Sequence, residues 1–337
     1  MSLPLLILSY LGLALVTVVS TSRASFFVNE FDKKTNISGA VIGGVMLAIV
    51  TSLPEFITSV TSTVIVGEPG LAFGNVFGSN LFNILILAVA DLIFIKHLFF
   101  NKTKTGVKTN SYIILMYVIF LLPVLLSKIS TSLGYQALDI KIGISFSLIS
   151  LLILVVYFLT VKSMSEELPE EKIGESHMSL RRILISFIAW GFMVVLASIV
   201  VTLVTDDLAK ELNLSASFAG AIFLGIATSL PELTAVITLF RLRNYDVALG
   251  NILGSNMFNM TIISVVDIIN VNEDIFQGLE SDAALANNVS LLLILGLVNS
   301  IIVLVALVRK KVENKVLYIL PSVLIIIGYL VYVSLSV

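Results

Sequence analysis

Residues 51–55 read Thr-Ser-Leu-Pro-Glu, and residues 228–232 repeat the same string. Each copy lies in the middle of a long apolar run, where a carboxylate and a proline are both costly. A second shared string follows each copy: Gly-Asn-Val-Phe-Gly-Ser-Asn-Leu-Phe-Asn at 74–83 and Gly-Asn-Ile-Leu-Gly-Ser-Asn-Met-Phe-Asn at 250–259. Both strings recur in the same order and at nearly the same separation. The chain is therefore predicted to contain two copies of one structural repeat.

The composition places the chain in a membrane. Of 337 residues, 58% are hydrophobic and 12% are charged, which is not the composition of a soluble globular domain. The net charge of −2 implies no charged macromolecular partner, and the absence of cysteine excludes disulfides and thiolate metal sites. The two histidines, His97 and His177, fall in polar connectors and are expected to be solvated.

Hydropathy predicts an all-α polytopic membrane protein with ten transmembrane helices. The first apolar run lacks a basic leading region and is longer than the core of a signal peptide, so we expect a retained helix. The predicted spans are residues 3–20, 38–65, 71–95, 110–127, 142–161, 183–205, 216–240, 247–270, 288–308 and 316–336.

The spans predict two repeats of opposite orientation. Residues 1–161 form a first five-helix repeat, 162–182 a cytoplasmic acidic linker, and 183–337 a second repeat. Since five crossings are an odd number, the second repeat is inverted, as in many secondary transporters. The linker carries several glutamates without the spacing of a Ca²⁺ loop, so we interpret it as a solvated connector.

The basic residues predict the orientation of the chain. With the N-terminus outside, all of the 20 lysines and arginines face inward except Lys128, Lys141 and Lys210. The positive-inside rule therefore predicts that both termini are outside and that the linker is cytoplasmic.

Glu55 and Glu232 are the main candidate site residues. Each lies near the middle of a predicted span, and no lysine or arginine lies inside any span. A carboxylate at that depth needs a partner, and without a basic residue this partner is expected to be a mobile cation or a proton.

The residues around each glutamate supply further oxygens. Proline before each glutamate removes a backbone donor, so carbonyls one turn earlier are expected to be open to a ligand. Thr51 and Thr228 lie four residues before Glu55 and Glu232, on the same helix face, and each offers a hydroxyl.

The second string combines glycines with small polar residues. The glycines at 74, 78, 250 and 254 form G-x-x-x-G pairs, which predict close helix packing. Serine and asparagine share a helix face in each copy, and their neutral oxygens suit hard cations such as Na⁺ and Ca²⁺. These residues are Ser79 and Asn83 in the first copy and Ser255 and Asn259 in the second.

Four polar side chains of the same spans lie outside this set. Asn75 and Asn251 are either ligands or braces between helices, and the spacing does not separate the two. Asp91 and Asp267 lie near the ends of their spans, so we predict an interfacial cap or a salt bridge for them.

These strings resemble the two α-repeats of the cation/Ca²⁺ exchanger superfamily, and in particular the prokaryotic sodium/calcium exchangers. The resemblance covers the ten-helix layout and both copies of both motifs. It implies that Glu55 and Glu232 bind Ca²⁺ and share Na⁺ sites. The further ligands that it implies are Thr51, Thr228, Ser52, Ser229, Ser79, Asn83, Ser255, Asn259 and the carbonyls of Ala48 and Gly225.

The sequence departs from the superfamily pattern in two places. The glycine that usually precedes Thr-Ser is Val50 in one repeat and Ala227 in the other, which implies different packing. The second string ends in Asn259, where related exchangers often have an aspartate. The centre then carries two carboxylates, enough to neutralise one Ca²⁺, and no acid within the asparagine motif that proton-coupled relatives typically have.

The predicted function is therefore a secondary antiporter, not an enzyme, in the cell membrane. It exchanges Na⁺ for Ca²⁺ by alternating access, with one helix group, the pair 3–20 and 183–205, moving against the rest. The expected ligands are the transported Ca²⁺ and Na⁺ ions, with no cofactor and no nucleic acid, and the expected functional form is a monomer.

Other functions compete with this prediction. The same glutamates could exchange H⁺ for Ca²⁺, or take Mg²⁺ or Mn²⁺, because buried carboxylates can carry protons. A cation channel would conduct without a counter-ion. An intramembrane aspartyl protease would need Asp91 and Asp267 to meet, yet the predicted topology puts them on opposite faces of the membrane.

Overall fold

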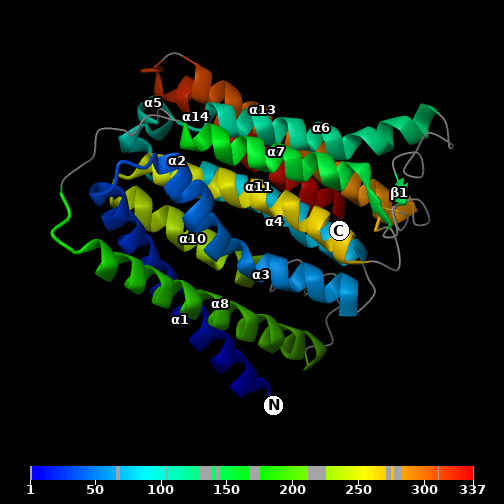
Figure 1. Ribbon diagram of the computed structural model, residues 1–337, viewed down its shortest axis with the longest axis horizontal. Helices are drawn as coiled ribbons and strands as arrows, with labels where there is room; N and C mark the ends of the chain where they lie inside the picture. The colour runs from blue at the N-terminus through cyan, green and yellow to red at the C-terminus, as the bar shows by residue number, and fades with distance from the viewer. Residues whose placement is uncertain are drawn as a thin grey trace. The chain divides into compact units, whose positions relative to one another are not determined.

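A computed structural model describes most of the chain and divides it into two compact units (Figure 1). Unit 1 comprises Met1–Pro54 and Glu167–Ser255, and unit 2 comprises Glu55–Glu166 and Asn256–Val337, so each unit contains parts of both repeats. The described residues are 2–65, 69–103, 105–129, 139–141, 145–166, 175–211, 225–270, 275–276, 283–309 and 311–336. The first part of the predicted span 216–240 lies outside them.

Unit 1 is helical. Its first helix, α1, packs along α8 and also contacts α10, and Figure 1 shows α1 and α8 side by side. Its elements are α1 (Leu3–Lys34), α2 (Gly39–Val41), the π-helix η1 (Ile42–Leu47), the first part of α3 (Ala48–Val60), α8 (Leu180–Glu211), α10 (Gly225–Arg241) and the first part of α11 (Tyr245–Ile269).

Unit 2 is organised around α13, which packs against α4, α6 and α14. A ribbon of two short antiparallel strands precedes α7. The elements are the rest of α3, η2 (Thr61–Ile65), α4 (Pro69–Ile93), η3 (Ile95–His97), α5 (Phe99–Lys102), α6 (Val107–Ile129), β1 (Asp139–Lys141), β2 (Ser145–Ser147), α7 (Leu148–Ser165), the rest of α11, α13 (Ala283–Val308) and α14 (Lys315–Ser336).

The helices confirm a multi-pass membrane protein. Among the described residues, eight helices are long and apolar enough to cross a membrane, and a ninth results if the bent pair Ile95–Lys102 and Val107–Leu122 is one span. The count of ten and the sides of the termini stay predictions.

The first helix is longer than predicted, because it ends at Lys34 and not at residue 20. Its buried face continues past residue 20 as small or hydroxylic side chains such as Thr21, Ala24 and Ser25. Its other face exposes large apolar residues such as Leu8. This is the arrangement of a membrane helix, in which small residues allow close helix contact and the apolar residues face lipid. A hydropathy profile detects the apolar residues that face lipid. It therefore did not detect the more polar residues 21–34, which continue the same helix.

Close backbone contact occurs in unit 1 where the glycines of α11 meet η1. A β-carbon on Gly254 would overlap the backbone of Gly44, and one on Gly250 would lie 3.1 Å from the Gly39 carbonyl oxygen. The predicted packing role is thus confirmed for Gly250 and Gly254. For the equivalent glycines at 74 and 78 in unit 2 the packing role stays a prediction; an added β-carbon there would meet no atom of the described residues within 4 Å.

This difference predicts opposite effects of two equivalent substitutions. Gly254→Ala should destabilise the protein by about 1–3 kcal/mol, because the new methyl overlaps backbone that cannot rotate away. Gly78→Ala is the matched control and should be neutral or slightly stabilising, since alanine favours a helix over glycine by about 1 kcal/mol. Thermal unfolding of the purified protein measures both, and equal midpoints for the two variants would contradict the packing described above.

Candidate functional site

The two predicted glutamates are both buried. Glu55 lies on α3 with none of its surface exposed, and Glu232 lies on α10 with 1% exposed. Pro54 and Pro231 are inside these helices, immediately before the glutamates. The irregular π-helical turn η1 leads directly into α3, and such turns are frequent at functional sites.

In unit 1, residues of both repeats surround the Glu232 carboxylate. Its Oε1 accepts hydrogen bonds from the Ser52 hydroxyl at 3.2 Å and from the Ser255 hydroxyl at 3.5 Å. Thr51 Oγ1 lies 3.2 Å from Ser255 Oγ and donates to the Ala48 carbonyl oxygen at 3.2 Å. Five of the predicted ligands are therefore brought together within this unit.

The remaining predicted residues of unit 1 lie on α10. Thr228 and Ser229 are buried, each with 1% exposed, about one turn before Glu232. Gly225 is the first described residue of this helix. The roles of these three residues stay predictions.

In unit 2, the Glu55 carboxylate faces α4. Its Oε1 accepts a hydrogen bond from the Ser79 hydroxyl at 3.0 Å. The Asn75 amide donates to the Glu55 carbonyl oxygen at 3.2 Å and to Ser59 Oγ at 3.0 Å. Asn75, for which the sequence left two roles open, is thus a brace between α3 and α4.

Four buried asparagines form a crossed arrangement in unit 2, which we name the asparagine quartet: Asn80 and Asn83 on α4, and Asn256 and Asn259 on α11. Asn83 Nδ2 donates to Asn256 Oδ1, and Asn259 Nδ2 donates to Asn80 Oδ1, both at 3.0 Å. The Oδ1 atoms of Asn83 and Asn259 are buried and accept no hydrogen bond from the described residues. Two predicted ligands therefore present amide oxygens that are open to a cation.

Sequence reasoning missed Asn80 and Asn256. Both occupy the same place in the repeated Gly-Ser-Asn triplet, which was the available signal. Their partners lie on the other repeat, at a separation of more than 170 residues, so no local spacing could reveal them.

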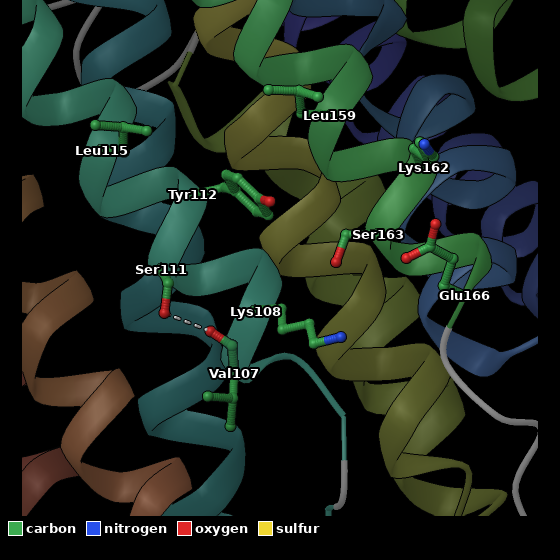
Figure 2. A pocket seen from close by; sticks show the side chains of 9 residues that line it. All are labelled: Val107, Lys108, Ser111, Tyr112, Leu115, Leu159, Lys162, Ser163 and Glu166. Carbon is green, nitrogen blue, oxygen red and sulfur yellow. Dashed lines mark hydrogen bonds between the residues drawn. The ribbon is translucent and has the colours of Figure 1, made fainter.

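A separate cavity lies between α6 and α7, away from the predicted ligands. It has a volume of about 630 Å³, and Figure 2 shows Tyr112, Lys108 and Ser163 around it. None of the predicted site residues lines it. Its lining combines Lys108, Lys162 and Glu166 with hydroxyl side chains at the polar ends of the two helices.

A comparison with protein-family models matches the family described as "Sodium/calcium exchanger protein" over residues 5–161 and 182–337. The chain belongs to the sodium/calcium exchanger family. The structure of a sodium/calcium exchanger from Methanococcus jannaschii superimposes with a TM-score of 0.65 and 18% identity, covering 95% of this chain and 97% of that one. This likeness supports the fold.

Two relatives of this exchanger-family protein have sequences 27% identical to it and names that do not specify the transported ions. The inner membrane protein YrbG of Escherichia coli (strain K12) is 27% identical, with 75% of each chain covered. The putative antiporter CaxA of Alkalimonas amylolytica is also 27% identical, covering 84% of this chain and 86% of its own.

One departure from the family pattern has a structural explanation. Val50 replaces the usual glycine before Thr-Ser, and its side chain packs against Gly191 of α8. A β-carbon on Gly191 would lie 3.2 Å from Val50 Cγ1, so the bulk at position 50 is accommodated by a glycine on the neighbouring helix.

Asp91 and Asp267 have related surroundings in unit 2. Asp91 accepts hydrogen bonds from the hydroxyls of Tyr318 and Ser322 on α14. Asp267 accepts from Ser147 N at 2.8 Å and Ser150 Oγ at 2.6 Å, at the start of α7. Both carboxylates are fully buried, so the predicted interfacial position was wrong. Each ties one repeat to the last helix of the other.

Loss of the Asp91 carboxylate should destabilise unit 2. Asp91→Ala leaves two buried hydroxyls without an acceptor, at a cost of about 1–3 kcal/mol for each. Asp91→Asn keeps one acceptor oxygen and should cost less, and Asp207→Ala on the exposed surface of α8 is the control. The midpoint of thermal unfolding should fall in the order Asp207→Ala, Asp91→Asn, Asp91→Ala. An unchanged midpoint for Asp91→Ala would show that these hydrogen bonds do not hold the repeats together.

Proposed function

We propose that this protein is a secondary antiporter that exchanges Na⁺ for Ca²⁺, and that the cations compete for a site built on Glu55 and Glu232. Membership of the sodium/calcium exchanger family supports cation antiport, and a relative described as a putative antiporter supports the same class. The transported ions are the substrates, and no resident cofactor takes part.

The observation that carries the proposal is the chemistry around the two glutamates. Both are buried in apolar helices, and the hydrogen-bonding groups described at their carboxylates are hydroxyls. Hydroxyls and amides stabilise a carboxylate only partly, and a negative charge in such a medium is costly unless a cation neutralises it. Oxygens of this kind are also the ligands that Na⁺ and Ca²⁺ prefer.

The proposed ligand set combines the two repeats. α3 carries Ser52, which bonds to Glu232 in unit 1, and Glu55, which bonds to Ser79 in unit 2. α11 likewise carries Ser255 and, one turn later, Asn259. We assign the cations to Glu55, Glu232, Thr51, Thr228, Ser52, Ser229, Ser79, Asn83, Ser255, Asn259 and the carbonyls of Ala48 and Gly225.

The charge of the proposed site explains why the protein would exchange cations and would not let them leak across the membrane. Two carboxylates give a charge of −2, which one Ca²⁺ or two Na⁺ neutralise, and an empty site should resist reorientation because its charge is uncompensated. We propose that α1 and α8, which pack along one another, form the group that moves, and that a single chain is the functional unit.

Sodium is the proposed counter-ion because the residues beside the glutamates are amides. Asn83 and Asn259 add neutral oxygens and no titratable group, so only the two glutamates could carry protons. H⁺ in exchange for Ca²⁺ or another divalent cation, carried on these same glutamates, is the alternative that the following experiment separates.

Uptake of ⁴⁵Ca²⁺ into proteoliposomes tests the proposal. Vesicles loaded with Na⁺ should accumulate Ca²⁺, whereas vesicles loaded with K⁺ or choline at equal pH should not. Glu55→Gln and Glu232→Gln should each abolish uptake, because either change halves the charge that binds Ca²⁺. Glu30→Gln is the matched control and should transport normally, since Glu30 pairs with Lys33 at the end of α1.

The possible results lead to different conclusions. Uptake that ignores internal Na⁺ but follows a pH gradient would replace Na⁺ by H⁺ and keep the glutamates as carriers. Uptake that survives in both glutamine variants would refute the site. No Ca²⁺ flux under either gradient would refute the substrate.

A further inference from the structure

The asparagine quartet has an orientation that follows from two backbone carbonyls. Asn80 Nδ2 lies 3.1 Å from the carbonyl oxygen of Asn256, and Asn256 Nδ2 lies 3.2 Å from the carbonyl oxygen of Asn80. A carbonyl oxygen can only accept a hydrogen bond, so the NH₂ group of each side chain must face it. The Oδ1 atoms of Asn80 and Asn256 consequently point to the other side of each amide.

The second pair of asparagines is fixed by the first pair. Asn80 Oδ1 is an acceptor, so the atom of Asn259 that faces it at 3.0 Å must be the donor Nδ2. The same reasoning fixes Asn83 against Asn256 Oδ1. In each case the remaining Oδ1 is turned away from the quartet, and this is the oxygen that accepts no hydrogen bond from the described residues.

We propose that Asn80 and Asn256 are positioning residues, which hold the Oδ1 atoms of Asn83 and Asn259 toward the transported cation. This inference rests on the proposed function, in which Asn83 and Asn259 are ligands. Each positioning residue acts on a ligand of the other repeat. Asn256 of the second repeat orients Asn83, and Asn80 of the first repeat orients Asn259.

The quartet also determines which residue types fit. An amide at 83 or 259 supplies the NH₂ group that the quartet needs and still leaves one oxygen for the ion. An ionised carboxylate there would place an oxygen against Asn80 Oδ1 or Asn256 Oδ1 without a hydrogen between them.

Alanine substitutions with a matched control test the proposal. Asn80→Ala and Asn256→Ala free the ligand amides to rotate, and second-shell changes of this kind lower metal affinity about 10- to 100-fold. The control is Asn110→Ala: Asn110 is equally buried in unit 2 and donates to the Ser300 carbonyl oxygen at 2.7 Å, but contacts no proposed ligand. The measured quantity is the Ca²⁺ concentration at half-maximal Na⁺-driven uptake.

Double substitutions distinguish positioning from a general structural effect. If Asn80 acts through Asn259, Asn80→Ala should add nothing to Asn259→Ala, whereas its effect should multiply with that of Asn83→Ala. The corresponding pairs with Asn256 should show the reverse pattern. Where alanine prevents folding, Asn80→Ser and Asn256→Ser replace it, because serine can bond to its own helix.

The crossed pattern together with an unchanged Asn110→Ala is the expected result. Equal affinity losses in Asn80→Ala and Asn110→Ala, or multiplying effects in the Asn80–Asn259 pair, would overturn the proposal while leaving the proposed function intact.

A second measurement separates the proposal from the function. If the wild type shows no Na⁺-driven uptake, the proposed function fails. The same pairs are then compared by the rise in unfolding temperature that Ca²⁺, Na⁺ or Mn²⁺ produces in the purified protein. The crossed pattern would support positioning for the cation that binds, and a wild type that none of these ions stabilises would overturn both proposals.

Discussion

The burial of Glu55 and Glu232 in apolar helices is the constraint on which the rest of the structure depends. A carboxylate without water is tolerated only where other groups share its charge. The structure supplies serine hydroxyls at 3.0 and 3.2 Å, and the Oδ1 atoms of Asn83 and Asn259 accept no hydrogen bond from the described residues. A proline inside the helix precedes each glutamate, and the π-helical turn η1 leads into α3.

The two repeats are tied together by polar side chains that cross between them. The asparagine quartet joins α4 to α11, and Asp91 and Asp267 join each of these helices to the last helix of the other repeat. Hydrogen bonds of this kind are suited to a membrane protein, because packing in lipid gains little from the hydrophobic effect. The contact units accordingly do not coincide with the repeats, and both units contain residues from each half of the chain.

The repeats are related in sequence but not identical in packing. Gly250 and Gly254 lie against the backbone of α2 and η1, whereas the equivalent glycines of α4 have no described atom so near. Val50 packs against Gly191 on α8, where a β-carbon would lie 3.2 Å from its Cγ1 atom.

The sequence by itself determined the membrane class, the repeat, the buried glutamates and the residue types beside them, because hydrophobic length and repeated motifs are local properties. It also singled out Ser79, Asn83, Ser255 and Asn259 as candidate ligands, because the repeated string places a serine and an asparagine on one helix face in each copy. It placed the end of α1 too early, because hydropathy does not register a helix whose buried face is polar. Only the tertiary structure decided which serine meets which glutamate, that Asn75 braces α3, and that Asn80 and Asn256 orient Asn259 and Asn83. These contacts join residues that are far apart in the chain, and their partners are chosen by helix packing, which no local spacing encodes.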